Sequence, residues 1–289
     1  MEQSAEMIRK PDLRASWAAW APAVGLIVLL AVAYFQPLKW MIMRWPLEPY
    51  SGGGMLIPPL SAYIIWLKKD HLRSLPIDGS NWGLLVLALA AALYFLGSWT
   101  GINYPYALSF LVMVWGMVLL LLGRAFAREL AFPIAFLVFM LPLSSALDPF
   151  IFSMRLLATR MAAWLPIALG LPTTVNGTEI LVRDYRLMVD MPCSGIRSVV
   201  ALMAGGALFA YFAQVSTWRK AIIFLSSLPL AVLINTLRID ITLLMGKTFG
   251  PQAASGLYHE WAGVVVFVFG LIGLFYITRW VTPCSPTDG

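Results

Sequence analysis

Long apolar runs alternate with short polar segments along the whole chain. A helix needs about 20 mostly apolar residues to cross a bilayer, and most of the runs approach or reach that length. The run Leu130–Ala146 is shorter and carries prolines. The run Gly54–Leu67 contains two adjacent prolines and counts as a crossing because of the charges around it. The pattern predicts eight membrane-spanning helices, at Trp17–Phe35, Gly54–Leu67, Trp82–Trp99, Pro105–Gly123, Leu130–Ala146, Ser198–Thr217, Ala221–Leu237 and Trp261–Thr278.

Basic residues mark every second junction between these spans. Lys and Arg concentrate in short cytoplasmic loops; here they precede the first span and follow the second, fourth, sixth and eighth. The first apolar run is longer than the run of about 7–15 residues in a signal peptide, so we expect it to be retained. Both termini are therefore predicted in the cytoplasm. The basic positions are Arg9, Lys10, Arg14, Lys68, Lys69, Arg73, Arg124, Arg128, Arg219, Lys220 and Arg279.

Two stretches between the fifth and sixth spans have a different pattern. Asp148–Gly170 carries Arg155 and Arg160 among apolar residues, and arginines are costly at mid-membrane. We expect an amphipathic helix that lies at the outer interface or is re-entrant. In residues 171–192 an Asn-Gly pair favours a tight turn, and the flanking runs are rich in Val, Ile and Leu. These features predict a small extracytoplasmic β-hairpin.

The composition agrees with a membrane protein. Of the 289 residues, 60% are hydrophobic and 12% are charged, whereas soluble domains have about 45–50% apolar and about 25% charged residues. Two cysteines are too few for a disulfide scaffold, and so apolar a chain is not disordered. The sequence predicts one all-α polytopic membrane domain over residues 1–289, with about eight transmembrane helices and a short cytoplasmic tail at 283–289.

Three reactive side chains fall at the predicted outer ends of three different spans. Cys193 directly precedes the sixth span, where a helix N-terminus lowers the pKa of a thiol. Arg238 emerges from the seventh span and His259 opens the eighth. Each alone has a plain explanation, as a buried thiol, a snorkelling arginine and an interfacial histidine. Together they match the nucleophile, oxyanion donor and proton donor of covalent acyl transfer.

Neighbouring polar residues are candidates to support this site. Arg197 and Asn235 lie about one helical turn from Cys193 and Arg238 respectively. One Cys and one His do not make a structural zinc site, which usually has four ligands, so we expect neither a metal nor a cofactor. The supporting candidates are Arg197, Asn235, Ser194, Asp190 and Glu260.

The blocks around the three residues resemble the exosortase/archaeosortase family. They are Pro-Cys-Ser-Gly-Ile-Arg-Ser at 192–198, Asn-Thr-Leu-Arg-Ile at 235–239, and His259 followed by Gly263. The first block is quite specific, while the other two are informative only in combination. The resemblance implies an integral membrane cysteine transpeptidase that processes C-terminal sorting signals of the PEP-CTERM kind, made of a motif, a transmembrane helix and a basic cluster. It implies Cys193 as nucleophile, with Arg238 and His259 completing the site.

The resemblance also implies a location in the inner membrane, with the site facing the periplasm and membrane-anchored proteins as substrates. The acceptor of the thioester is not identified, and no nucleic-acid partner is expected. One alternative is a hydrolytic membrane cysteine endopeptidase, which uses water where a transpeptidase uses an amine. A second is a non-catalytic assembly or transport protein for envelope polysaccharide. A transporter should carry ionisable groups at mid-membrane, and the predicted spans nearly lack them.

Overall fold

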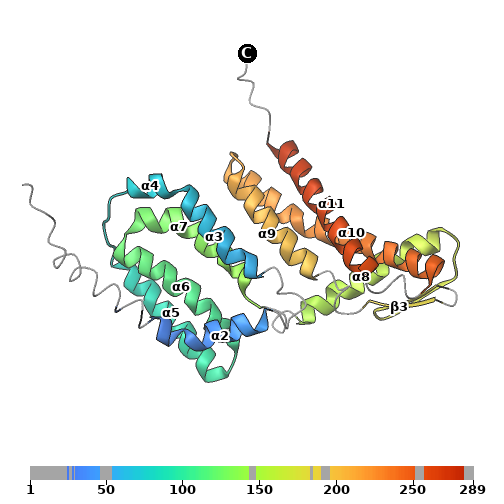
Figure 1. Cartoon of the computed structure of the whole chain (residues 1–289), viewed down its shortest axis with the longest axis horizontal. Coiled ribbons are helices and arrows are strands. Elements are labelled where there is room, and N and C mark those ends of the chain that lie inside the picture. Colours follow the sequence, from blue (N-terminus) through green and yellow to red (C-terminus); the bar gives the residue numbers. More distant parts are fainter. Residues whose placement is uncertain are drawn as a thin grey trace, which may run out of the picture.

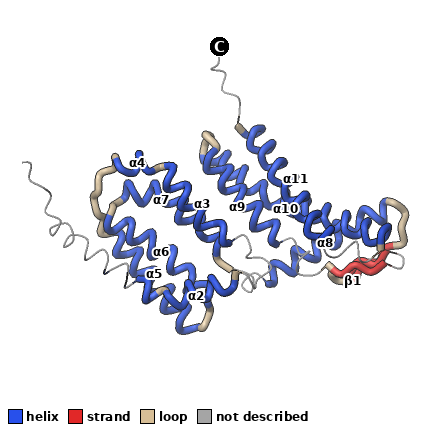
Figure 2. Tube along the Cα trace, in the orientation of Figure 1, coloured by secondary structure: helices blue, strands red, loops and turns tan. Residues whose placement is uncertain are grey.

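A computed structural model describes residues 30–45, 54–142, 148–182, 185–189, 196–250 and 257–282, together with Gly25 and Val28. The described chain is mostly helical with one small sheet (Figures 1 and 2). The helices are α2 (Phe35–Arg44), α3 (Ile57–Leu67), α4 (Lys69–Arg73), α5 (Trp82–Thr100), α6 (Asn103–Leu121), α7 (Arg124–Phe136), α8 (Asp148–Ala168), α9 (Ile196–Phe212), α10 (Thr217–Phe249) and α11 (Leu257–Val281), with 3₁₀ turns η1 (Gly54–Leu56) and η2 (Leu137–Met140).

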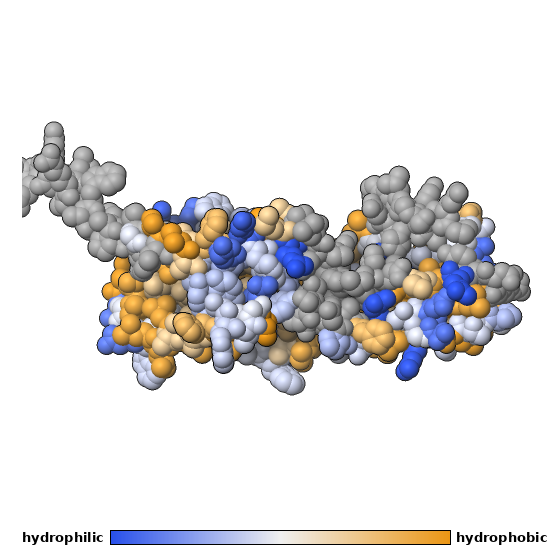
Figure 3. All heavy atoms as spheres, turned by 90° about the horizontal axis from the view of Figure 1, so that it is seen from below, coloured by the Kyte–Doolittle hydropathy of each residue, from blue (hydrophilic) through white to orange (hydrophobic). Residues whose placement is uncertain are grey.

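The first half of the chain forms a bundle in which α5 and α6 are an antiparallel hairpin. Glycines hold these two helices close together. A Cβ atom on Gly83 would lie 2.5 Å from the backbone nitrogen of Leu120, and one on Gly97 would lie 2.6 Å from that of Tyr106. Any larger residue at either position would therefore push the helices apart. Large apolar side chains cover the outside of the hairpin, among them Phe95, and Figure 3 shows the apolar surface at this side of the molecule. Such a surface suits contact with lipid.

Helices α9, α10 and α11 form a second bundle (Figure 1). Their shared core contains Val199 and Leu202 of α9 and Ala231 of α10, with Phe267 of α11 packed against it. The two bundles meet through Ala204 of α9, which belongs to the same apolar cluster as Phe136, Met140 and other residues of the first half.

The sheet packs with α8 and the second half of α10 as one further layer. Its strands are β1 (Thr173–Asn176), β2 (Glu179–Val182) and β3 (Tyr185–Met188), antiparallel in the order β1-β2-β3. The prediction of a two-stranded hairpin is therefore wrong in the number of strands, because the sheet has three. β1 and β2 flank the predicted Asn-Gly turn and pair from Thr173 with Val182 to Asn176 with Glu179, so the additional strand is β3, which pairs with β2. The shared core contains Ala158, Ala162, Ala163, Ile180, Val182, Val189, Ile239 and Leu243.

Four described helices are long and apolar enough to cross a membrane: Trp82–Thr100, Asn103–Leu121, Thr217–Phe249 and Gly263–Val281. Each coincides with a predicted span. Two shorter apolar helices, Gly54–Leu67 and Ser198–Phe212, coincide with two more. The first predicted span lies mostly outside the described residues.

The predicted span Leu130–Ala146 is not one continuous helix. It divides between the end of α7 at Phe136 and η2, which ends at Met140. Pro142 follows and restricts the backbone before it to extended conformations, as at Leu141. Eight spans therefore remain a prediction, and four are supported by helix length.

Helix α10 is longer than predicted. The sequence placed its end at Leu237, but it continues to Phe249. Its 33 residues cover about 50 Å, whereas the hydrocarbon core of a bilayer is about 30 Å thick. The extension is stabilised because Ile239 and Leu243 are buried against α8 and the sheet. Arg238 therefore lies within a continuous helix rather than at its tip.

One end of the molecule, here called the basic end, carries Lys68, Lys220 and Arg279. The Nζ atom of Lys68 lies 5.3 Å from the centre of the Tyr211 ring, and Nζ of Lys220 donates to the Tyr211 carbonyl oxygen at 3.4 Å. Val281, close to Arg279, shares an apolar cluster with Val215 of the α9–α10 turn. These basic positions, predicted at separate cytoplasmic junctions, thus share one end of the fold.

An ion pair joins α3 to α7 at the basic end. Lys68 Nζ lies 2.6 Å from Glu129 Oε2. This hydrogen bond and the nearby positive charge lower the pKa of Glu129. Partial burial is the largest single influence and opposes the charged form of Lys68, but the interactions with Glu129 and Tyr211 together outweigh it and raise the pKa of Lys68. The pair therefore stabilises the contact between the two helices.

We expect Glu129→Gln to lower the free energy of unfolding by about 1 kcal/mol, or the melting temperature by about 2–4 °C. Because the pKa of Glu129 is lowered in the folded state, its contribution is present above the ordinary value of 4.5 and is lost as the pH falls through the folded value. Thermal unfolding of the detergent-solubilised protein should therefore separate the variant from the wild type at pH 7 and not in strong acid. An equal difference at both pH values would contradict this role.

Candidate active site

Helices α10 and α11, which carry Arg238 and His259, pack with α9, the helix that follows Cys193 in the sequence. Val199 of α9, Ala231 of α10 and Phe267 of α11 belong to one apolar cluster, which Met154 of α8 also contacts. Along the chain, Val199 is three residues after the start of α9, Ala231 is seven residues before Arg238, and Phe267 is ten residues after the start of α11. We call the end at which α9 and α11 begin, opposite the basic end, the site end.

Arg238 reaches from α10 to α11. Its guanidinium is half-buried and lies beside Gly263, where an added Cβ would be 3.6 Å from both Cζ and Nε. Gly263 is one helical turn after His259 on α11, so both positions share a face of that helix. The side chain of His259 lies outside the described part, but its backbone belongs to the first turn of α11. The guanidinium of Arg238 therefore lies beside a position of α11 that is one helical turn after the backbone of His259.

Helix α10 becomes polar around Arg238. Asn235, one turn earlier, is 2% exposed, and Thr242 Oγ1 donates to the carbonyl oxygen of Arg238 at 2.9 Å. Asp240 is half-buried, and among the described residues nothing is hydrogen-bonded to its Oδ1 atom. Sequence reasoning missed Asp240. Its signal was the density of polar residues at 235–242 inside an otherwise apolar helix.

The segment that contains the predicted nucleophile lies outside the described residues. This applies to Cys193, Ser194 and Asp190, while Arg197 and Glu260 are described only as backbone in α9 and α11. In the sequence, Cys193 comes three residues before Ile196, where α9 begins.

Arg155 fixes the chain just before this segment. The Nη2 and Nε atoms of Arg155 donate to the carbonyl oxygen of Val189 at 2.8 and 3.2 Å. Val189 is fully buried, and its N–H donates to the carbonyl oxygen of Thr178 at 2.9 Å. Both backbone groups of Val189, its N–H and its carbonyl oxygen, are therefore hydrogen-bonded. Val189 is four positions before Cys193 in the sequence. The sequence showed only that Arg155 would be costly at mid-membrane. It did not reveal this role, because the acceptor is 34 residues away along the chain.

We expect Arg155→Met to change the rate at which a thiol reagent labels Cys193, because methionine keeps the aliphatic volume and loses both hydrogen bonds to the carbonyl oxygen of Val189. Arg160→Met is the matched control, since Arg160 is exposed on the same helix. Equal rates in the two variants would show that Arg155 does not position this segment.

Among the residues whose side chains the structure describes, no group of three or more His, Cys, Asp or Glu residues is placed to hold a metal ion. Cys193 and His259 are outside that set, so the expectation of a metal-free site remains a prediction.

Comparison with known families gives one result. The model of a family described as transmembrane exosortase matches residues 45–276, which is most of the chain and includes all three predicted reactive residues. No curated protein matches the chain, and no solved structure matches it.

Proposed function

Because the chain belongs to the transmembrane exosortase family, we propose that it is a membrane transpeptidase that cuts the C-terminal sorting signal of exported proteins through a thioester on Cys193. The observation that supports this most directly is the position of Arg238. Its guanidinium lies against Gly263, one turn from His259, at the end of the bundle where α9, the helix that follows Cys193 in the sequence, begins. A cationic donor beside a thiol and an imidazole suits acyl transfer.

The reaction that we propose has two steps. The Cys193 thiolate attacks the scissile carbonyl carbon, Arg238 stabilises the oxyanion, and His259 protonates the leaving amine as the C–N bond breaks. Arg238 is not the acid, because a guanidinium stays protonated near neutral pH. An acceptor amine then attacks the thioester and gives its proton to His259, the C–S bond breaks, and the thiolate and the protonated imidazole are restored. Water as acceptor would make the enzyme an endopeptidase.

The proposed topology has eight spans, with the basic end in the cytoplasm and the site end facing the periplasm. It is supported by the shared end of Lys68, Lys220 and Arg279, since basic residues concentrate on the cytoplasmic side. In this arrangement, Asn235 and Arg155 support the site from within the fold. A substrate tethered in the same membrane gains proximity, which lowers the barrier by several kcal/mol.

An iodoacetamide probe on the full-length protein tests the proposal. We expect labelling of Cys193 and much slower labelling of Cys284, with Cys284→Ser as the control that removes background. Mass spectrometry of the processed substrate then identifies the acceptor, because an amine adds mass to the new C-terminus and water leaves a free carboxylate. A free carboxylate would favour the endopeptidase. No labelling of Cys193 at native pH would favour a non-catalytic assembly protein.

A further inference from the structure

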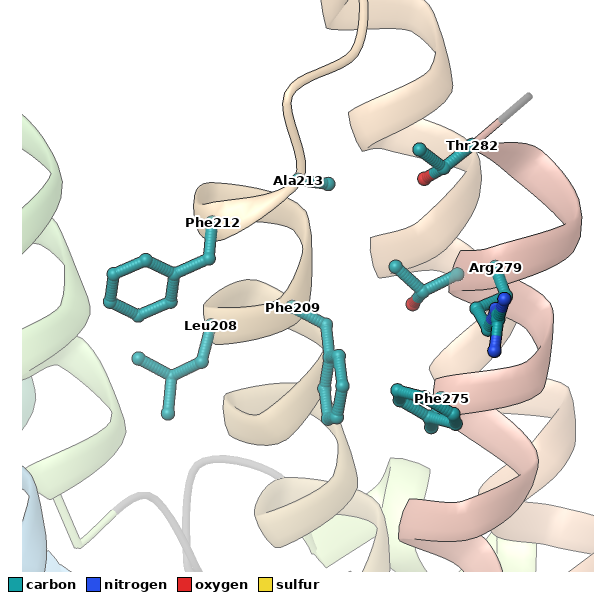
Figure 4. A pocket seen from close by; sticks show the side chains of 8 residues that line it. Leu208, Phe209, Phe212, Ala213, Phe275, Arg279 and Thr282 are labelled. Carbon is teal, nitrogen blue, oxygen red and sulfur yellow. The ribbon is translucent and has the colours of Figure 1, made fainter. Parts of the chain in front are cut away.

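A groove opens between α9 and α11 at the basic end, far from the candidate active site. Its volume is about 530 Å³, within the range of about 300–1,000 Å³ for small-molecule sites. The walls are largely apolar, with Phe209 of α9 and Phe275 of α11 lying between the two helices (Figure 4). Leu208 and Phe212 also line the groove, and their side chains point away from α11 at the outer side of α9 (Figure 4). The groove therefore suits a hydrocarbon chain.

One end of this groove is polar and cationic. Arg279, Thr278 and Thr282 line it there. The hydroxyl of Thr278 already donates to the carbonyl oxygen of Leu274 at 2.8 Å, so Arg279 and Thr282 supply the available donors. Arg279 is exposed, and within the described ranges no carboxylate forms an ion pair with it. This end suits an anion.

Exposed tryptophans indicate the depth of Arg279 in the membrane. Trp280 is 87% exposed and Trp218, at the start of α10, is 74% exposed. Tryptophan is enriched at the membrane–water interface. Arg279 therefore lies at the level of the lipid phosphates, and the apolar walls extend from there toward the acyl-chain region.

We propose that this groove is a binding site for one anionic phospholipid. The phosphate contacts Arg279 and Thr282, and an acyl chain lies along Phe209 and Phe275. Charge favours a lipid over a peptide, because a transmembrane segment ending in a basic cluster would bring cations against Arg279. The site is separate from the proposed active site, since Arg279 is about 24 Å along α11 from Gly263. The proposal does not depend on the proposed catalysis.

Native mass spectrometry of the full-length protein, released from nanodiscs of phosphatidylglycerol or phosphatidylcholine, tests this site. We expect one phosphatidylglycerol to be retained in preference to phosphatidylcholine. Arg279→Gln removes the charge, and Ala213→Phe fills the groove where Ala213 lines it. Each should reduce retention of phosphatidylglycerol by about 5-fold or more.

Arg219→Gln is the matched control, because it removes one positive charge at the same end from a residue outside the groove lining. The Arg219→Gln variant should retain the lipid. The Arg279→Gln variant should still fold, because Arg279 is exposed. Equal retention of the two lipids, or equal loss in Arg279→Gln and Arg219→Gln, would overturn the proposal. So would a photoreactive group at position 212 that crosslinks to the substrate's transmembrane helix instead of lipid.

Discussion

Replacing Cys193 with alanine should abolish processing of the substrate, with a fall in rate of at least about 1,000-fold, while the protein still inserts and folds. The reason is that the proposed thioester cannot form without the sulfur atom. Cys193→Ser should be nearly as inactive, because a serine hydroxyl ionises far less readily than a thiol and the proposed mechanism begins from the thiolate. Both variants are measured by the accumulation of uncut substrate in cells that also produce the enzyme.

Cys284 offers the control for this experiment, as the second and last cysteine of the chain. Cys284→Ala should process substrate at the wild-type rate, because the residue follows α11 and is far along the chain from Arg238. If the Cys193→Ala protein is present in the membrane at normal amounts and uncut substrate does not accumulate, Cys193 is not the nucleophile.

Replacing Arg238 with alanine should lower the rate of the chemical step by about 100- to 1,000-fold. An oxyanion donor acts mainly on the transition state, so the fall should appear in kcat rather than in KM. Arg238→Lys should recover part of the rate, since lysine keeps the charge but lacks the planar fork of guanidinium donors. The measurement is steady-state cleavage of a membrane-anchored substrate by purified enzyme.

The contact with Gly263 provides a second way to displace the same guanidinium. A Cβ on Gly263 would lie in ordinary contact with Arg238, so Gly263→Leu should push the guanidinium away and lower kcat without removing it. Lys247→Gln serves as the control, because it removes a positive charge from an exposed position later on the same helix. If Arg238→Ala and Lys247→Gln have similar kcat values, Arg238 does not stabilise the oxyanion.

Local patterns along the chain were sufficient for much of the helical architecture. The spans at Trp82–Trp99 and Pro105–Gly123 were predicted within a few residues of α5 and α6, because an apolar run of membrane length leaves the backbone only a helix. The amphipathic segment Asp148–Gly170 is likewise helical, as α8. Cys193, Arg238 and His259 could be selected from the sequence, because reactive residue types at the predicted ends of three spans are visible without a structure.

Contacts between distant segments could not be predicted in this way. α10 continues past Arg238 because Ile239 and Leu243 are buried against α8 and the sheet. The role of Arg155 depends on a carbonyl group 34 residues away. None of these stabilising partners is local, so no periodicity in the sequence records them.

The sequence by itself determined that this chain enters a membrane, which residue types capable of acyl transfer it holds at the predicted ends of its spans, and where its basic residues lie along the chain. The reason is that partition into lipid, nucleophilicity and charge belong to single residues or short runs. Only the tertiary structure decided that the Arg238 guanidinium lies against Gly263, that Arg155 holds Val189, and that a cationic groove opens between α9 and α11. These features depend on the packing of separate helices, which is a property of the whole fold.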